Sequence, residues 1–317
     1  MTGTISPMKP NIFFNSNLDS PDEWRAALAT HFVDVKFSTA GDTENPEDVD
    51  IALVWTIPDD GLERFVNLRA ILSLGAGVNQ LDPTRLPAHV PLARLVDPSL
   101  TRTMVDYAKT AVYRYHRRFH EFERLSRRSE WKFIPPTLTR DTSVALLGLG
   151  ELGREIAGDL RREGFRVLGW SRTPKQMDNI QTYTGRDGLA SMVAESDIII
   201  NVLPLTDDTR HILCRELFSH CRRGACLINI GRGLHLVEAD LLEAIDEKII
   251  ADATLDVGTV EPIPPAHPFW NHPHILITPH VAGLSMPETA SKAIAENIRK
   301  AMAGERLLHQ VDLGRGY

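Results

Sequence analysis

The chain has 317 residues, enough for about two domains that each bury a core of their own. An apolar fraction of 43% and a charged fraction of 24% are ordinary for a globular protein and exclude disordered and fibrous classes. Lys and Arg number 35 against 42 Asp and Glu, so the formal net charge is −7. Bulk attraction to nucleic acid or to an anionic membrane surface is therefore not expected.

The three cysteines, Cys214, Cys221 and Cys226, show no CxxC spacing, which argues against a disulfide framework or a zinc site. Residues 1–14 contain no apolar stretch of signal-peptide length, and the longest apolar runs fall far short of the ~20 residues that cross a bilayer. We therefore expect a cytoplasmic protein without a metal ion.

Short apolar runs alternate with amphipathic helical stretches along the first hundred residues. Strands are expected at 11–14, 33–37, 51–55, 70–74 and 92–96, with crossover helices between them. Ser20-Pro21-Asp22-Glu23 predicts the start of one such helix, with Ser20 as N-cap and Glu23 closing a capping box. Residues 100–128 contain neither Gly nor Pro and predict one long helix.

A second series of elements begins after the break at Pro135-Pro136. Strands are expected at 144–147, 166–170, 197–201, 225–230, 249–256 and 275–278, separated by helices such as 151–163 and 238–246, with a final helix at about 287–302. Strands that are apolar along their whole length and alternate with helices predict parallel sheets covered on both faces. The fold class is therefore α/β.

The strand at 144–147 leads into Gly148-Leu149-Gly150-Glu151-Leu152-Gly153, a GxGxxG motif, and then directly into a helix. Gly148 would allow a tight turn, Gly150 would let the backbone approach a pyrophosphate, and Gly153 would let helix and strand pack closely. The pyrophosphate would lie at the helix N-terminus, where N–H groups favour an anion. This strand–loop–helix context predicts a dinucleotide site.

The end of the next strand bears on which dinucleotide binds. An NAD site places Asp or Glu there for the ribose 2′-OH, whereas this chain has Ser171 and no carboxylate before Asp178. Ser171, Arg172 and Lys175 would instead bind a 2′-phosphate through a hydroxyl and two cations. The alternative is that Arg172 and Lys175 are solvated loop charges. We predict NADPH as the cofactor, with NADH as the weaker alternative.

Three loops at the carboxyl ends of expected strands each carry one chemically capable side chain: Arg232, Glu261 and His280. Hydride delivery to a carbonyl carbon leaves negative charge on oxygen, so the reaction needs an electrophilic group and a proton. His280 can give the proton, and Glu261 can orient its imidazole and favour the imidazolium. Arg232 can polarise the carbonyl and bind an adjacent carboxylate. The three together predict reduction of a 2-keto acid.

A substrate-binding segment is expected in the first domain. Gly75-Ala76-Gly77 follows the strand at 70–74, and its backbone N–H groups would cradle a carboxylate in the interdomain cleft. Trp55 ends the strand at 51–55 and would wall the same cleft, which favours small substrates such as glyoxylate or hydroxypyruvate. The alternative for Trp55 is a place in the core.

The ordered motifs GxGxxG, NIGRG, DVxxxEP and TPHVAG resemble those of the D-isomer-specific 2-hydroxyacid dehydrogenases over nearly the whole chain. Trp170-Ser171-Arg172 and Arg117-Arg118-Phe119 look most like the glyoxylate/hydroxypyruvate reductase A branch, whose members prefer NADPH. The resemblance implies Arg232 as substrate anchor, Glu261 as the histidine's partner and His280 as the acid/base. The cofactor contacts expected within or near the motifs are Glu151, Leu152, Leu203, Pro204, Ile230, Asp256 and Ala282.

The same resemblance implies a domain plan and an assembly. We expect two doubly wound parallel-sheet domains: a Rossmann-type dinucleotide-binding domain at 102–285, and a smaller flavodoxin-like substrate-binding domain formed by 1–101 and 286–317. The long helix at 100–128 would help to build a homodimer. Asn79 stands where the family commonly has Asp, and Gly258 where many members carry an aromatic residue.

Two other functions stay open at this point. One is an NADH-dependent D-2-hydroxyacid or phosphoglycerate-type dehydrogenase. The other is a non-enzyme, a dinucleotide-sensing binding protein similar to the co-repressors that use this fold.

Overall fold

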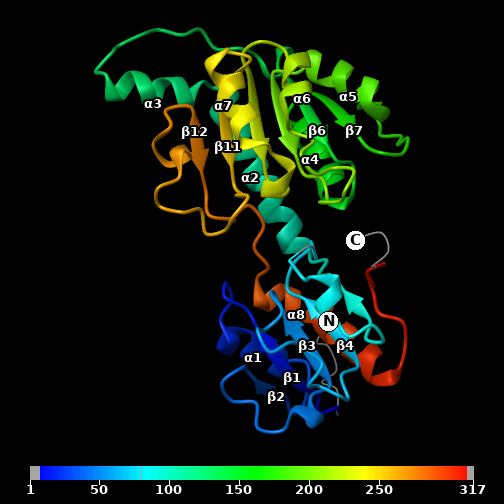
Figure 1. The fold of residues 1–317 in the computed structure, drawn as a ribbon. Coiled ribbons are helices and arrows are strands. Elements are labelled where there is room, and N and C mark those ends of the chain that lie inside the picture. The colour runs from blue at the N-terminus through cyan, green and yellow to red at the C-terminus, as the bar shows by residue number, and fades with distance from the viewer. Residues whose placement is uncertain (1–7, 79, 313–317) are drawn as a thin grey trace. The chain divides into compact units, whose positions relative to one another are not determined.

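The structure, a computed structural model, describes residues 8–78 and 80–312 and divides the chain into two compact units (Figure 1). The first unit holds the described residues up to Leu100 and from Ser285 onward, and the second runs from Thr101 to Leu284. The domain boundaries expected from the sequence lie one residue from these. Each unit is built on a parallel sheet with helices, so the expected α/β class is confirmed.

The first unit contains a five-stranded sheet of order β2-β1-β3-β4-β5, in which all neighbours pair in parallel. Its strands are β1 (Asn11–Asn15), β2 (Lys36–Ser38), β3 (Ile51–Val54), β4 (Ala70–Ser73) and β5 (Leu92–Ala93). This is the strand order of flavodoxin-like sheets. Because the strands are parallel, the loops after β3 and β4 leave the same edge, and Trp55 and Gly75 begin them.

One face of the five-stranded sheet is covered by α1 (Pro21–Ala29) and α8 (Pro287–Ala303), from opposite ends of the chain. Trp24, Leu28 and Ile298 are fully buried between these helices and the sheet. Ser20 is the N-cap of α1, as predicted, and its hydroxyl accepts a hydrogen bond from the Glu23 N–H at 3.5 Å.

Of the expected crossover helices, α1 is present between β1 and β2, but the prediction of such helices between β2 and β5 is wrong. The described residues between β2 and β5 form loops and the short 3-10 turns Pro46–Asp48 and Pro83–Arg85. Each connection carries prolines or glycines, which remove or weaken helical hydrogen bonds. Apolar side chains of these loops, such as Leu62 and Phe65, cover the opposite face of the sheet instead.

Two strands of the first unit are shorter than expected. The strand at 33–37 reduces to β2, and the strand at 92–96 reduces to the two residues of β5. The last part of the chain compensates by pairing with β5: the Val311 N–H donates to Leu92 O at 2.8 Å, and the Arg94 N–H donates to His309 O at 3.2 Å.

The second unit contains a seven-stranded sheet of order β12-β11-β10-β9-β6-β7-β8, again parallel throughout. Its strands are β6 (Ser143–Leu147), β7 (Arg166–Trp170), β8 (Gln181–Tyr183), β9 (Ile198–Asn201), β10 (Ala225–Asn229), β11 (Ile250–Leu255) and β12 (Ile275–Ile277). Only β8, a polar edge strand of three residues, was not expected. The order reverses between β6 and β9, which is the switch point where such sheets bind ligands.

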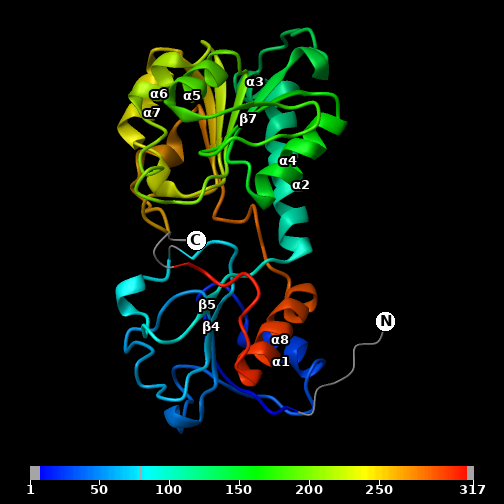
Figure 2. The same ribbon diagram turned by 90° about the vertical axis from the view of Figure 1, so that its right-hand side faces the viewer.

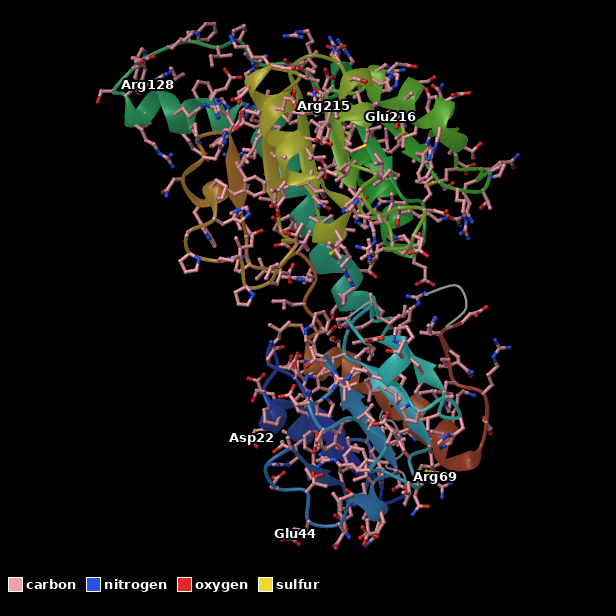
Figure 3. The ribbon with its side chains drawn as sticks, in the orientation of Figure 1. Asp22, Glu44, Arg69, Arg128, Arg215 and Glu216 are labelled. Atoms are coloured by element: carbon pink, nitrogen blue, oxygen red, sulfur yellow. The ribbon has the colours of Figure 1, made fainter. Side chains whose placement is uncertain are left out.

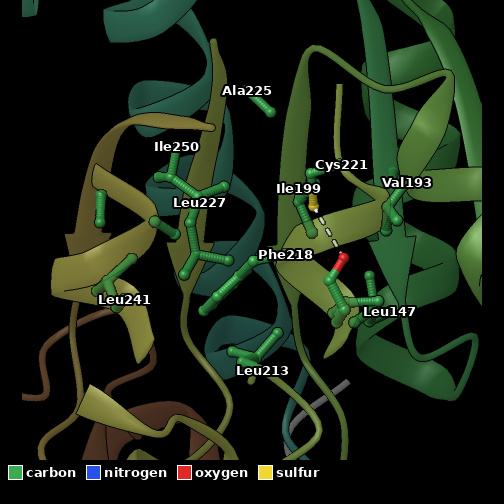
Figure 4. Close-up of a cluster of buried hydrophobic side chains, with 14 of the residues drawn as sticks. Leu147, Val193, Ile199, Leu213, Phe218, Cys221, Ala225, Leu227, Leu241 and Ile250 are labelled. Carbon is green, nitrogen blue, oxygen red and sulfur yellow. Dashed lines mark hydrogen bonds between the residues drawn. The ribbon is translucent and has the colours of Figure 1, made fainter. Parts of the chain in front are cut away.

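Helices cover both faces of this sheet. Figure 2 shows α5 (Gly185–Ala194), α6 (Arg215–His220) and α7 (Glu238–Asp246) on one face, and α2 (Pro98–His116) and α4 (Glu151–Arg162) on the other. Leu147, Phe218 and Leu241 belong to the apolar cluster between the sheet and the first group (Figure 4). Burial in this cluster raises the pKa of the Cys221 thiol to about 12, so the thiol is unreactive.

The prediction of a single helix at 100–128 is wrong, because the structure has two helices in this region. The chain turns after α2 because Arg118 takes a left-handed conformation with φ 58°, and α3 (Phe119–Arg127) then begins. The turn lets the Arg124 guanidinium reach the buried carboxylate of Asp252 in β11 at 2.7 Å. No Gly or Pro marks the break in the sequence. The left-handed conformation of Arg118 is unfavourable for a residue with a side chain, and the ion pair between Arg124 and Asp252 helps to stabilise it.

The surfaces of both units are charged. Figure 3 shows Asp22, Glu44 and Arg69 on the outside of the first unit, and Arg128, Arg215 and Glu216 on the outside of the second. Among the residues that the structure describes, no helix is both long and apolar enough to cross a membrane.

Candidate active site

The loops that follow β6, β9, β10, β11 and β12 leave the same edge of the seven-stranded sheet, because these strands are parallel neighbours. The loop after β6 carries the GxGxxG motif and the loop after β9 carries Leu203-Pro204. Arg232, Glu261 and His280 follow β10, β11 and β12, which lie side by side.

Glu261 and His280 form a hydrogen-bonded pair, with 2.7 Å between Oε2 and Nδ1. The other carboxylate oxygen, Oε1, accepts the Gly258 N–H at 3.0 Å, so the carboxylate is fixed at both ends. Burial alone would raise the pKa of Glu261, but the hydrogen bonds from His280 and Gly258 and the charges of His280 and Arg232 lower this pKa overall. An ionised Glu261 keeps a proton on Nδ1 of His280, and Nε2 is the ring nitrogen that does not bond to Glu261.

Arg232 is half-buried and its backbone is held on both sides. Its N–H donates to His235 Nδ1 at 3.0 Å, and its carbonyl accepts Asn229 Nδ2–H at 3.1 Å. Burial lowers the pKa of the guanidinium while the Glu261 carboxylate raises it. Arginine remains a cation under these opposing effects.

A close backbone approach joins the loop of Arg232 to the loop of Glu261. A Cβ atom on Gly233 would lie 1.8 Å from Gly258 O, so only glycine fits at position 233. Gly258 itself is crowded, since a Cβ there would lie 2.6 Å from Ile263 Cγ1. Ile263 thus occupies the space beside Gly258 into which a side chain at position 258 would point.

A buried polar network that the sequence analysis missed joins two of these loops. Asn201 Nδ2–H donates to Asn229 Oδ1 and to His235 Nδ1, both at 2.9 Å, and His235 Nε2–H donates to Pro204 O at 3.2 Å. His235 is fully buried, and burial lowers its pKa to about 4, so its ring is neutral near pH 7. A polar Asn at the end of each apolar strand was the available signal, whereas nothing singled out His235.

The glycines of the GxGxxG motif occupy positions where a side chain would interfere. Gly148 has φ 110°, and a Cβ on Gly153 would lie 1.8 Å from Gly148 O. Gly150 is exposed, has open space where a Cβ would be, and is the N-cap of α4 without a side-chain cap. No side chain at Gly150 caps the first turn of α4, whose backbone N–H groups are of the kind that bind an anion. Glu151 is exposed and Leu152 half-buried in that turn.

The loop after β7 differs in one respect from the expectation. The Ser171 side chain is buried, and its hydroxyl donates to Thr173 O at 2.7 Å. Its proton is therefore engaged within the turn and is not offered to a phosphate. Arg172 is exposed and Lys175 half-buried, so these two cations are the groups of this loop that an anion could meet from solvent.

Asp256 is buried and its carboxylate accepts three hydrogen bonds. Oδ1 accepts Thr278 Oγ1–H at 2.6 Å and the Val281 N–H at 2.9 Å, and Oδ2 accepts the Ala282 N–H at 2.8 Å. Burial raises the pKa of Asp256 overall, because it outweighs the lowering by these three donors and by the charge of His280. The carboxylate thus holds the loop that contains His280.

The remaining expected cofactor contacts differ in exposure. Leu203, Ile230 and Ala282 are buried, and Pro204 is exposed. A Cβ on Gly148 would lie 3.3 Å from the Leu203 side chain, so Leu203 adjoins the glycine loop.

In the first unit the structure brings Trp55 and Gly75 together. A Cβ on Gly75 would lie 2.5 Å from the Trp55 ring, which therefore packs on the bare backbone of the Gly75–Gly77 turn. Trp55 and Gly77 are half-buried, as is Ala76. Ser73 Oγ fixes the start of the turn by accepting the Gly75 N–H at 3.2 Å. Asn79 lies outside the described residues.

Comparison with known proteins identifies the family. The family model described as "D-isomer specific 2-hydroxyacid dehydrogenase, NAD binding domain" matches residues 110–282. The chain belongs to the D-isomer-specific 2-hydroxyacid dehydrogenase family. The resemblance inferred from the sequence motifs is thereby confirmed.

Curated and solved relatives agree with this assignment. A protein of Serratia proteamaculans named "Glyoxylate/hydroxypyruvate reductase A" is 40% identical, over 97% of this chain and all of its own length. A D-isomer-specific 2-hydroxyacid dehydrogenase of Xanthobacter autotrophicus, solved with NADPH and MES, is 40% identical with TM-score 0.90, over 97% of this chain and 99% of that one. The NADPH-dependent glyoxylate/hydroxypyruvate reductase of Sinorhizobium meliloti, solved with NADP and sulfate, is 33% identical with TM-score 0.89, over 98% of this chain and all of that one.

The buried, neutral His235 predicts a specific loss of stability in acid. The pKa of the unfolded residue is about 6.5 and that of the folded residue about 4, so between these values the unfolded state binds more protons. The stabilisation is complete above about pH 6.5 and is lost as the pH falls toward 4, by roughly 3 kcal/mol in total. This loss is measured by urea unfolding of wild type and His235→Gln at about pH 7 and about pH 4.5. Gln is chosen because it can donate and accept hydrogen bonds but does not titrate.

We expect the stability advantage of wild type over His235→Gln to shrink by roughly 2 to 3 kcal/mol between the two pH values. His220→Gln, at an exposed position at the end of α6, is the control and should follow wild type. An advantage that does not change with pH would contradict a neutral His235.

Proposed function

We propose that this protein is an NADPH-dependent reductase that converts a small 2-keto acid into the 2-hydroxy acid. The observation that carries the proposal is the 2.7 Å hydrogen bond between Glu261 and His280. The positive charge of Arg232 also acts on this pair, since it lowers the pKa of Glu261. The three side chains lie on neighbouring strand ends of a sheet whose switch point carries the glycine loop. The relatives named glyoxylate/hydroxypyruvate reductase A support this function and favour glyoxylate or hydroxypyruvate as substrate.

The residues of the second unit fit NADPH. The glycine loop and the uncapped N-terminus of α4 would hold the pyrophosphate, and Arg172 and Lys175 would hold the 2′-phosphate. Lining residues would be Glu151, Leu152, Leu203, Pro204, Ile230, Asp256 and Ala282. Ser171 would act by shaping the turn that carries the two cations, since its hydroxyl donates to Thr173 O. When bound, NADPH supplies the hydride. The structures of relatives that contain NADPH and NADP support this choice.

The substrate is held by its carboxylate and polarised at its carbonyl. Arg232 can do both, because a planar guanidinium binds two oxygens at once and stays cationic. The Gly75 N–H already donates to Ser73 Oγ, so the N–H groups of Ala76 and Gly77 would offer a second cradle for the carboxylate. Trp55, packed on the backbone of Gly75, would restrict the size of the substrate. This contribution of the first unit is part of the proposal.

The proton for the product oxygen comes from His280. Glu261 holds Nδ1–H, which directs Nε2–H toward the reacting oxygen and stabilises the imidazolium before transfer. Negative charge that develops on the oxygen is met by the Arg232 guanidinium, which needs no reorganisation at that moment.

A homodimer is part of the same proposal. Between the start of α3 and the start of β6 the chain exposes five large apolar side chains, Phe119, Phe122, Trp131, Phe133 and Leu138. Trp131 is 103% exposed and Phe133 83%, and aromatic side chains exposed to this extent favour contact with another protein. We assign this surface to a second copy of the chain.

The three unpaired cysteines also support a cytoplasmic location, which recovery of the protein from an oxidising compartment would contradict.

Replacement of the acid tests the proposed function. In His280→Ala, reduction of glyoxylate with NADPH should fall at least about 100-fold, since general acid catalysis supplies about that much or more. NADPH affinity, measured by fluorescence titration, should stay within about twofold because the glycine loop is untouched. His220→Ala, at an exposed site, serves as the control. Full turnover in His280→Ala would refute the assignment.

Sedimentation velocity tests the dimer. Wild type should sediment as a dimer, and the double variant Trp131→Ser/Phe133→Ser should sediment as a monomer at micromolar concentration, because the apolar area that drives association is lost. Val33→Ser/Val66→Ser, at exposed apolar sites of the first unit, should remain dimeric. A monomeric wild type would contradict the proposal.

A further inference from the structure

We propose that Tyr107 is a positioning residue for His280, acting through a chain of hydrogen bonds that runs by way of Thr278 and Asp256. The inference rests on the proposed function, because it names what orients the proposed acid. Tyr107 lies in the middle of α2 and belongs to none of the sequence motifs that indicated the family.

The chain of hydrogen bonds is short and has a single direction. Tyr107 Oη and Thr278 Oγ1 are 2.5 Å apart, and Thr278 Oγ1 and Asp256 Oδ1 are 2.6 Å apart. Thr278 donates its one hydroxyl proton to Asp256 Oδ1, which leaves only its lone pairs for Tyr107. Tyr107 must then donate to Thr278. Hydrogen bonds ordered in one direction polarise and strengthen one another.

Asp256 passes this order on to the loop of His280. Its backbone carbonyl accepts the His280 N–H at 2.8 Å, and its carboxylate accepts the N–H groups of Val281 and Ala282 at 2.9 and 2.8 Å. One residue therefore binds three consecutive backbone N–H groups that begin at the proposed acid.

The loop needs this support because the sheet no longer provides it. The Thr278 N–H donates to Leu255 O at 3.0 Å, and beyond this bond the chain leaves the ladder of β12 and β11. His280 then takes a left-handed conformation with φ 55°, which is uncommon for a non-glycine residue and persists only where surrounding contacts determine it. Tyr107 connects the loop to a helix of 19 residues, which is a stiffer support than the three-residue strand β12.

Removal of one oxygen atom tests the inference. In Tyr107→Phe, we expect kcat for glyoxylate reduction to fall about three- to tenfold, the range that corresponds to one net hydrogen bond. NADPH affinity should stay within about twofold and the melting temperature should be close to that of wild type. Tyr113→Phe is the matched control, since Tyr113 lies on the same helix and its hydroxyl donates to Glu163 at 3.0 Å instead of to Thr278. Tyr113→Phe should keep the kcat of wild type.

A double-mutant cycle distinguishes the chain from a general effect on packing. Thr278→Val breaks the chain at its middle, so adding Tyr107→Phe to it should lower kcat by less than about 1.5-fold further, because coupled residues are not additive. Independent, multiplicative losses would overturn the inference. So would a Tyr107→Phe enzyme with the kcat of wild type, or one that only melts earlier.

The outcomes separate the two proposals. If wild type reduces no 2-keto acid, the proposed function itself fails. If wild type is active and Tyr107→Phe behaves as Tyr113→Phe does, only the role of Tyr107 fails. Thr278→Val keeps the test decisive should Tyr107→Phe not fold, since a fully active Thr278→Val enzyme would also refute the chain.

Discussion

The hydrogen bond between Glu261 and His280 is the contact on which the rest of this site depends. It joins side chains 19 positions apart, on loops that follow two neighbouring parallel strands. The parallel order of β10, β11 and β12 brings these loops and the loop of Arg232 to one edge. Gly233 then lets the Arg232 loop approach the carbonyl of Gly258 more closely than any side chain would permit. The fold thus places a cation, a carboxylate and an imidazole together before any ligand arrives.

Two buried polar networks lie beneath these three side chains. Asn201, Asn229 and His235 hold the backbone of Arg232 on one side. Asp256, supported by Thr278, holds the backbone from His280 onward on the other side. Within each network the buried donors and acceptors are hydrogen-bonded to one another. These bonds give the loops a defined conformation beyond the point where the regular hydrogen bonds of the sheet end. Loops alone would not hold reacting groups in place to the fraction of an ångström that catalysis requires.

The sequence predicted most of the second unit, because its strands are apolar throughout and its helices have strong periodicity. β7 and α7 begin and end where they were expected, and the three proposed catalytic residues follow three adjacent strands. Features that depend on distant contacts were not predictable. The break at Arg118 is stabilised by Arg124 and Asp252, whose contact no local pattern reveals. The inward hydroxyl of Ser171 and the role of His235 likewise follow from burial and hydrogen bonding, which residue type alone does not determine.

The central claim is that this constellation reduces a small 2-keto acid with NADPH, and steady-state turnover of the wild-type protein tests it most directly. The measurement is the rate of cofactor oxidation with glyoxylate, hydroxypyruvate, pyruvate and phenylpyruvate, each with NADPH and with NADH. We expect turnover of glyoxylate and hydroxypyruvate with NADPH, with kcat/KM at least about tenfold lower for NADH and for phenylpyruvate, since about 1.4 kcal/mol of lost contact suffices for that. Tight NADPH binding without turnover of any of the four acids would contradict the account.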